Sequence, residues 1–293
     1  MTDPLVCAIL LTRDRPRIAA RAVASFRTQT YANKRLFVLD NGDGDLLRST
    51  LPFQSGEAWL NWNPARGKSI GVLRNMAAEL SYTGLGMPQL EDELPEIVVH
   101  WDSDDVSHPN RIAEQVALLQ SSGADCVGYR DMLFWRTFPG PQAIPCPAEP
   151  HPIFVRRSGS ILAHRDSQGH TCVASEKEWG EAWLFTGGTP NYALGTSLCY
   201  WRQTWARKSF LDQAQGVEEK WCDGLKVVSV ASMIDPCVGG AAATEISEPR
   251  MIASIHGGNT STGYDIEKYV RDGSKQWQRA PEWDNYCRER MKL

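Results

Sequence analysis

The chain has no apolar run that approaches the roughly 18 residues a membrane-spanning helix needs. It also lacks an excess of basic residues, because 31 Lys and Arg stand against 35 Asp and Glu and the net charge is -4. A basic footprint for nucleic acid is therefore absent at the level of the whole chain. The eight cysteines form no Cys-x-x-Cys pair, so a structural zinc site is not expected. The first residues lack the basic and apolar regions of a signal peptide, and we expect a cytoplasmic protein.

What the chain does contain is an ordinary globular composition, with 42% hydrophobic and 23% charged residues over 293 positions. Residues 5–11 and 36–39 are apolar runs that suit buried parallel strands, and the second strand ends in Asp40. Between these runs, Ile18, Ala22 and Phe26 recur at helical spacing. A strand, a helix and a second strand in succession predict a right-handed βαβ unit, and hence an α/β fold.

The most informative stretch is 97–105, where an apolar strand ends in three closely spaced carboxylates. Pro109 suits the first position of a following helix, which Ser107 or His108 can cap. The carboxylates therefore fall in a turn between strand and helix, where open α/β sheets bind ligands. Like charges packed so closely repel one another unless a cation lies among them. A hard divalent cation that also holds a diphosphate is the obvious candidate.

Each of these signals has a plainer interpretation. Asp-x-Asp alone is weak evidence, and the stretch can equally be a solvated acidic turn. Arg74, near the start of a helix expected from about residue 67, can clamp a phosphate, but a single arginine is more often a solvated surface residue. Thr12, Asp40 and Asp102 all fall at the carboxyl ends of expected strands, so we expect them to line one rim of the sheet.

The second half of the chain has a different residue pattern, with many prolines and short strand-like runs. A proline-rich stretch at 139–152 predicts a stiff irregular loop. Residues 160–164 and 182–185 suggest short antiparallel strands, 250–255 another strand, and 216–221 a helical stretch. The aromatic side chains that we expect to offer stacking faces to a second substrate are Trp183, Tyr192, Tyr200, Trp201 and Trp221.

Taken in order, five short motifs make the chain resemble the family 2 glycosyltransferases with the GT-A fold. The motifs are 12–16 (Thr-Arg-Asp-Arg-Pro), 25–31 (Ser-Phe-Arg-Thr-Gln-Thr-Tyr), 38–42 (Val-Leu-Asp-Asn-Gly), 71–75 (Gly-Val-Leu-Arg-Asn) and 102–105 (Asp-Ser-Asp-Asp). Asp14 stands where the family usually has Asn. The resemblance is strongest from Val6 to about Leu119, returns at 195–221 and 256–261, and does not extend over 133–189.

The resemblance implies a Rossmann-like, mostly parallel nucleotide-binding sheet with a smaller antiparallel region on the acceptor side. It implies that Thr12 and Asp40 hold the base and ribose of a nucleotide, and that Arg74 contacts the diphosphate. Asp102 would lie near the ribose or the metal. Asp104 would be the main ligand of Mn²⁺ or Mg²⁺.

The later motifs of the family imply further roles. Glu218 and Glu219 fall where the family carries Glu-Asp, whose second acid is commonly the catalytic base. Here the second acid is Glu219, one methylene longer, and the assignment between the two stays open. A pair of acids at a helix start is also favoured by the helix dipole. His256 resembles a late histidine that completes the metal site in some GT-A enzymes, and its alternative role is structural, at a strand end.

These features predict a single catalytic domain over 1–293, with a nucleotide-sugar-binding part at 1–129 and an acceptor-binding and catalytic part at 130–293. We expect a metal-dependent inverting glycosyltransferase. It would move a sugar from a nucleoside-diphosphate sugar, with UDP favoured, to a hydroxyl on a glycan or a lipid-linked glycan. The oligomeric state stays open.

Other functions stay in view. A hydroxymethylated base of phage-type DNA is a further candidate acceptor, because a local basic group could form from Arg156, Arg157, Arg202, Arg207 and Lys208. A nucleotidyltransferase would need a glycine-rich basic loop after the first strand, which 12–16 is not. The remaining alternative is a non-catalytic module that binds a sugar nucleotide or a glycan.

Overall fold

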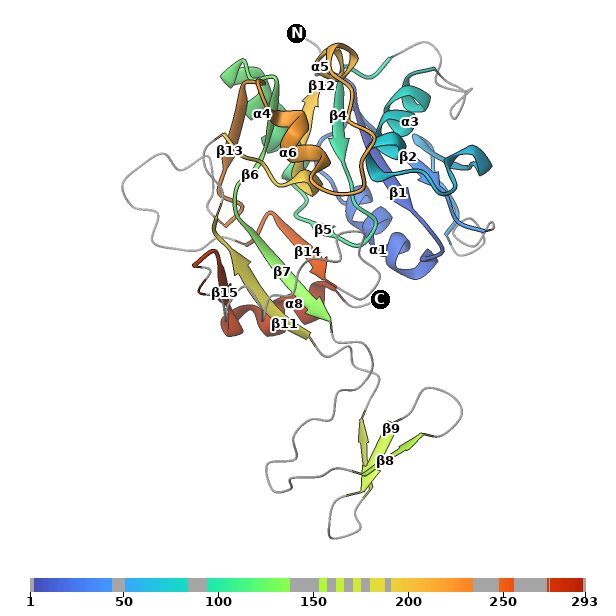
Figure 1. The fold of residues 1–293 in the computed structure, drawn as a ribbon, viewed down its shortest axis with the longest axis vertical. Helices are drawn as coiled ribbons and strands as arrows, with labels where there is room; N and C mark the ends of the chain where they lie inside the picture. The colour runs from blue at the N-terminus through green and yellow to red at the C-terminus, as the bar shows by residue number, and fades with distance from the viewer. Residues whose placement is uncertain are drawn as a thin grey trace.

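A seven-stranded sheet forms the centre of the molecule (Figure 1), in the order β13-β6-β12-β4-β1-β2-β3. The computed structural model describes residues 3–43, 51–83, 94–137, 153–156, 162–165, 171–174, 180–187, 191–233, 248–255, 273 and 275–291. The strands of this sheet are β1 (Val6–Thr12), β2 (Lys34–Asp40), β3 (Glu57–Asn61), β4 (Ile97–His100), β6 (Cys126–Tyr129), β12 (Cys199–Trp201) and β13 (Val227–Val230). Neighbouring strands run parallel, except that β12 is antiparallel to both β4 and β6. The predicted mostly parallel α/β sheet is confirmed.

Helices cover both faces of this sheet, because alternate residues of each strand point to opposite sides. On one face, Val6, Ala8 and Leu10 pack with α1 and α4. On the other face, Cys7 and Ile9 pack with α3 and α6. The helices are α1 (Pro16–Arg27), α3 (Ile70–Thr83), α4 (Arg111–Ser122), α5 (Arg202–Arg207), α6 (Val217–Cys222) and α8 (Asp284–Arg290), and the 3-10 turns are η1 (Asn63–Ala65), η2 (Gly195–Ser197) and η3 (Pro281–Trp283).

A second sheet of five strands has the order β15-β11-β7-β14-β5. Its pairs are antiparallel except for β7 and β14, which run parallel, so the expected antiparallel region is present with one exception. A third sheet pairs β8, β9 and β10 antiparallel. The strands are β5 (Val106–Ser107), β7 (Met132–Thr137), β8 (Ile153–Arg156), β9 (Leu162–Arg165), β10 (Thr171–Ala174), β11 (Gly180–Phe185), β14 (Met251–Ile255) and β15 (Trp277–Arg279).

The helix after the acidic turn begins later than expected. It starts at Arg111 with Asn110 as its N-cap residue and has no side-chain cap, so the expected start at Pro109 was wrong. Ser107 does not cap the helix because it belongs to β5, where it pairs with β14. His108 instead accepts a hydrogen bond at Nδ1 from the Asn110 amide, at 3.1 Å. The second sheet thus begins directly behind the acidic turn.

The motif at 25–31 joins α1 to the start of α4. Gln29 donates from Nε2 to the His108 carbonyl at 2.8 Å and accepts at Oε1 from the Ile112 amide at 3.0 Å. The Thr30 amide donates to the Pro109 carbonyl at 2.8 Å. These bonds hold the chain that follows the acidic turn against the end of α1.

The described residues do not include the proline-rich loop at 139–152, Arg157, or the motif at 256–261 with His256. Among the helices of the described ranges, none combines the length and the apolar character required to cross a bilayer.

Candidate functional site

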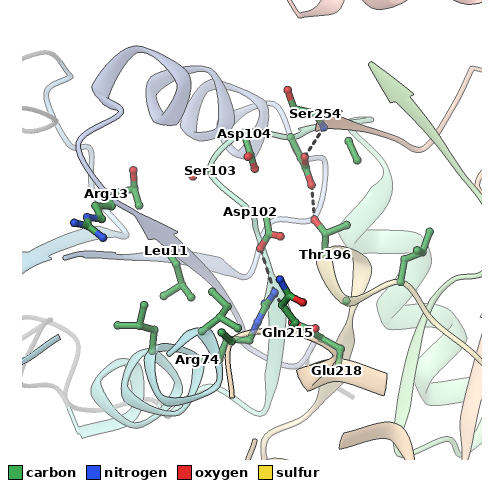
Figure 2. Close-up of a pocket in the computed structure, with 18 of the residues that line it drawn as sticks. Leu11, Arg13, Arg74, Asp102, Ser103, Asp104, Thr196, Gln215, Glu218 and Ser254 are labelled. Atoms are coloured by element: carbon green, nitrogen blue, oxygen red, sulfur yellow. Dashed lines mark hydrogen bonds and ion pairs between the residues drawn. The ribbon is translucent and has the colours of Figure 1, made fainter. Parts of the chain in front are cut away.

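A cavity of about 680 Å³ lies beyond the carboxyl ends of β1 and β4 (Figure 2). Its size falls within the range of small-molecule sites, about 300–1,000 Å³. Segments far apart in the sequence form its wall: the turn after β1, α3, the acidic turn, η2, α6 and β14. The residues of the predicted site that line it are Thr12, Arg74, Asp102, Asp104, Glu218 and Glu219.

Thr12 ends β1 and is almost fully buried, with 3% of its surface exposed. Its hydroxyl oxygen has no hydrogen-bond partner among the described residues. A buried polar group left unpaired costs about 1–3 kcal/mol. A polar atom of a ligand in the cavity could satisfy this hydroxyl, which makes Thr12 a fitting contact for a nucleotide.

Asp40 lies beside Thr12 in the register of β1 and β2, but it does not line the cavity. Its carboxylate is buried and accepts a hydrogen bond from the Gly42 amide at 2.9 Å. Burial raises its pKa, and this hydrogen bond opposes the rise. Its neighbour Asn41 lines the cavity instead. Asp40 therefore stabilises the turn at Gly42. Asn41, and not Asp40, lies at the side of the cavity where we expect the nucleotide.

The first and third motifs interlock beside the cavity. Asp14 has φ 51°, in the left-handed region that Asp and Asn tolerate better than most residues. Its Oδ1 accepts a hydrogen bond from the Asp43 amide at 2.8 Å. A Cβ at Gly42 would lie 2.4 Å from that oxygen, so only glycine fits there. The two motifs are thus packed against each other at the site.

Arg74 is buried beneath the cavity, so the alternative of a solvated surface arginine is wrong. Its Nη2 lies 2.7 Å from Glu218 Oε1 and 3.6 Å from Asp102 Oδ1, and its Nη1 contacts His100 Nδ1. Burial alone would lower the pKa of Arg74, but the two carboxylates raise it. The side chain therefore supplies a fixed positive charge between the acidic turn and α6.

Two further buried residues support this region and were not predicted. His100 is fully buried, and burial together with the nearby Arg74 holds its pKa well below the usual value, so it is neutral. Arg111 is also fully buried and donates from Nη2 to the carbonyls of His100 at 2.9 Å and Thr196 at 3.0 Å. Arg111 thus fixes the end of β4 against η2.

The three carboxylates of the acidic turn have different surroundings. Asp105 accepts hydrogen bonds from the Thr196 hydroxyl and, at 3.0 Å, from the Ser254 amide. Burial, followed by the charges of Asp104 and Asp102, raises its pKa well above the usual range. Each of its oxygens accepts a hydrogen bond, so Asp105 joins the turn to η2 and β14.

Asp102 and Asp104 face the cavity. Burial raises the pKa of Asp102, and the charge of Arg74 opposes that rise. Asp104 lies 3.3 Å from Nη1 of Arg15, whose Nη2 donates to the Ser103 hydroxyl at 3.4 Å. Both carboxylates are therefore balanced by an arginine of the chain.

The donor chemistry of Asp102 and Asp104 fits a hard divalent cation. Magnesium-type sites use one or two carboxylates and leave the other positions to water and phosphate oxygens. Among the described residues, no group of three or more His, Cys, Asp and Glu side chains is placed to hold a metal. The expected further ligand, His256, lies outside these residues. Asp102 and Asp104 thus have the donor chemistry that such a cation needs. Three further carboxylates line the same cavity, those of Asp105, Glu218 and Glu219.

Glu218 and Glu219 occupy the first turn of α6, after Gly216 in the left-handed region. Glu218 is partly buried and bound to Arg74, whereas Glu219 is exposed and lines the cavity. A Cβ at Gly195 would lie 2.5 Å from the Glu218 carboxyl carbon. The glycine therefore makes room for Glu218 and fixes the geometry of this pair.

The expected aromatic stacking faces are mostly core residues, which corrects that prediction. Tyr200 and Trp221 are fully buried, and Trp183 is buried in the second sheet. Phe210 stacks on Trp221 with ring centroids 4.7 Å apart, and Tyr200 lies 4.8 Å from Trp221. These rings fill the face of the central sheet under α6. Of the five aromatics named above, Tyr192 lines the cavity.

The local basic group is used in contacts within the chain. Arg207 pairs with Asp125 at 2.8 Å. Lys208 donates to the Lys220 carbonyl at 3.3 Å. The side chains of Arg156 and Arg157 lie outside the described residues. The described members therefore give no support to a DNA-binding surface.

Several residues that line the cavity were not predicted from the sequence. Arg15 and Asn41 belong to quoted motifs, so their positions beside Thr12 and Asp40 were a usable signal. Lys68 precedes α3 and Thr196 lies in η2, where no pattern in the sequence distinguishes them.

No protein-family model matches the chain. A curated relative, the uncharacterized protein y4gI of Sinorhizobium fredii, is 32% identical over 129 residues, which is 43% of this chain and 13% of that protein. Among solved structures, S. aureus TarS covers 86% of this chain at 11% identity with a TM-score of 0.50, over 37% of its own length. TarS 1-349 in complex with UDP-GlcNAc covers 89% at 12% identity and a TM-score of 0.50, over 61% of its length. The chain has the fold of these glycosyltransferases, and such low identity shows the fold alone.

Proposed function

We propose that the chain is a metal-dependent inverting glycosyltransferase of family 2 that takes its sugar from a nucleoside-diphosphate sugar, with UDP the favoured nucleotide. The observation that carries the proposal is that one cavity collects the unpaired hydroxyl of Thr12, the carboxylates of Asp102 and Asp104, and the acidic pair Glu218 and Glu219. The complex of TarS with UDP-GlcNAc, which shares the fold, supports a donor of this class.

The donor would lie along the wall between the turn after β1 and α3. Figure 2 shows Leu11 and Arg13 on one side of the cavity and Thr196 and Ser254 on the other. The base and ribose belong on the first side, near Thr12. A divalent cation held by Asp102 and Asp104 would neutralise the negative charge that gathers on the leaving diphosphate.

The chain's own charges also favour departure of the diphosphate. Arg74 holds a permanent positive charge beneath Asp102, in a buried position where water screens it little. That charge does not have to reorganise during the reaction, which is how preorganised sites stabilise developing charge.

Glu219 is the proposed general base. Glu218 is committed to Arg74 at 2.7 Å, whereas Glu219 is exposed at the cavity wall. A carboxylate there can take the proton of an acceptor hydroxyl as that oxygen attacks the anomeric carbon. Attack from the face opposite the leaving diphosphate inverts the anomeric centre. The acceptor, a glycan or a lipid-linked glycan, would approach past Tyr192, within the part of the chain at 130–293.

A thermal-shift screen of nucleoside diphosphates, with Mn²⁺ and with EDTA, tests the proposal. A ligand at a hundred times its Kd stabilises by about 2.7 kcal/mol, and we expect a rise of about 5 °C in Tm for one nucleotide with Mn²⁺ present. A chain that shows no shift with any nucleotide under either condition would contradict the proposed donor class.

A further inference from the structure

Arg15 lies beside Asp104, the carboxylate of the acidic turn that we propose as the main metal ligand. It precedes α1 as the residue at its N-cap, and its guanidinium lies 3.3 Å from Asp104 Oδ2. The side chains of Arg15 and Asp104 are 25% and 14% exposed, and both line the cavity. The pair is therefore accessible to a ligand in the cavity and is partly shielded from water.

The main chain of the acidic turn is held independently of this pair. Arg21 on α1 donates from Nη2 to the Asp104 carbonyl at 2.9 Å. Trp101 donates from its indole to the Ala22 carbonyl at 2.8 Å. Because α1 anchors the backbone through these bonds, a change of partner at Asp104 requires movement of two side chains and no shift of the turn.

A guanidinium and a divalent cation on the same carboxylate repel each other, because both are cations, and the repulsion is strongest where the metal takes Oδ2, the oxygen that Arg15 contacts. Arginine cannot lose its charge in a protein, so its side chain relieves this repulsion by moving. The nearest new anion would be the donor's diphosphate, bound to the same metal in the same cavity. The planar fork of arginine suits phosphate oxygens well.

We propose, on the basis of the proposed function, that Arg15 is the counter-ion of Asp104 in the donor-free protein and transfers to the diphosphate when a divalent cation takes Asp104. Without a donor, Arg15 competes with the metal. With a donor, it strengthens nucleotide binding. Metal and nucleotide therefore bind cooperatively, and the cation alone binds weakly.

Titration of Mn²⁺ and of UDP tests this with the variant Arg15→Gln and the control Arg17→Gln. Arg17 is exposed on α1 and does not line the cavity, so its variant removes the same charge at a neighbouring position. Partly exposed ion pairs are worth up to about 1 kcal/mol, so we expect Arg15→Gln to bind Mn²⁺ alone about two- to five-fold more tightly. We expect the same variant to bind UDP in the presence of Mn²⁺ about ten-fold more weakly, because a charged hydrogen bond is lost. Arg17→Gln should match the wild type in both titrations.

The opposite signs of the two changes distinguish this role from a structural one, since damage to the fold weakens both affinities. Mn²⁺ affinity that is unchanged or reduced in Arg15→Gln overturns the inference, as does undetectable Mn²⁺ binding by both proteins. Failure of wild-type protein to bind any nucleoside diphosphate is a separate result, which contradicts the proposed function.

Discussion

At the residue scale, the two neighbouring glutamates of α6 are distinguished by a single ion pair. Glu218 is fixed by Arg74, which also pairs with Asp102, so its carboxylate is held within a partly buried network of ion pairs. Glu219 is exposed at the cavity wall. The sequence places Glu219 where the family commonly has its base and leaves the assignment open, and the buried Arg74 distinguishes the surroundings of the two glutamates.

The variant Glu219→Gln should keep donor binding and lose transfer, because an amide cannot take a proton from an acceptor. General bases contribute about 10²–10⁴-fold, so we expect a loss of that size in the release of nucleoside diphosphate from the donor sugar. The Kd for the nucleotide should stay within about two-fold of the wild type, as measured by titration calorimetry.

The matched control is Glu218→Gln, one residue away. It removes the charge that Arg74 faces at 2.7 Å and should lower the free energy of unfolding by about 1–3 kcal/mol. If Glu218→Gln abolishes transfer with donor binding intact, and Glu219→Gln does not, then the base is Glu218 and the assignment made here is wrong.

At the scale of elements, the position of the acidic turn depends on the contact between α1 and α4. Gln29 is buried and uses both ends of its amide there, and the Thr30 amide adds a third bond. The motif at 25–31, which carries part of the resemblance to a family, therefore has a structural role. It fixes the chain immediately after Asp102 to Asp105.

Replacing Gln29 with Ala should destabilise the protein, since the Ile112 amide loses this partner and the His108 carbonyl is left with its bond from the Arg111 amide. Each buried group left unpaired costs about 1–3 kcal/mol, and we expect a loss of that order in urea unfolding. Gln120→Ala, at an exposed position of α4, is the control and should change stability by less than about 0.5 kcal/mol. Equal stability of the two variants would argue against the link between α1 and α4.

The placement of α6 depends on close packing against α3. A Cβ at Gly71 would lie 1.9 Å from the Leu211 carbonyl oxygen, so the loop before α6 can approach α3 only at a glycine. Asn75 donates to the Phe210 carbonyl at 2.8 Å and accepts from the Phe210 amide at 2.9 Å. The motif at 71–75 therefore supplies Arg74 to the site and also holds the loop that leads to Glu218 and Glu219.

At the scale of the whole molecule, strand periodicity and the order of motifs were sufficient to predict the fold. The apolar runs became β1, β2 and β4, and the cavity lies at the ends of β1 and β4, whereas Asp40 at the end of β2 does not line it. Thr12, Arg74, Asp102, Asp104, Glu218 and Glu219 were all brought to one place. Thr12 and Asp102 share the cavity because parallel strands place their ends at one edge of the sheet.

Other features could not be predicted because they depend on contacts between distant segments. Asp40 and Asn41 are adjacent, and the turn geometry at Gly42 decides which of them reaches the cavity. Tyr200 and Trp221 have the composition of a sugar-binding surface, but packing against Phe210 places them in the core. Arg15 lies 89 positions from Asp104, and only the fold brings them together.

The most direct test of the central claim is a calorimetric titration of UDP into the wild type and into Asp104→Ala, each with Mn²⁺ and with EDTA. We predict that Mn²⁺ tightens UDP binding to the wild type by about ten-fold or more, because Asp104 would hold a cation that neutralises the charge of the diphosphate. In Asp104→Ala, the affinity should be equally weak with Mn²⁺ and with EDTA. A variant that keeps the full gain from Mn²⁺ would show that Asp104 does not hold the metal of the donor.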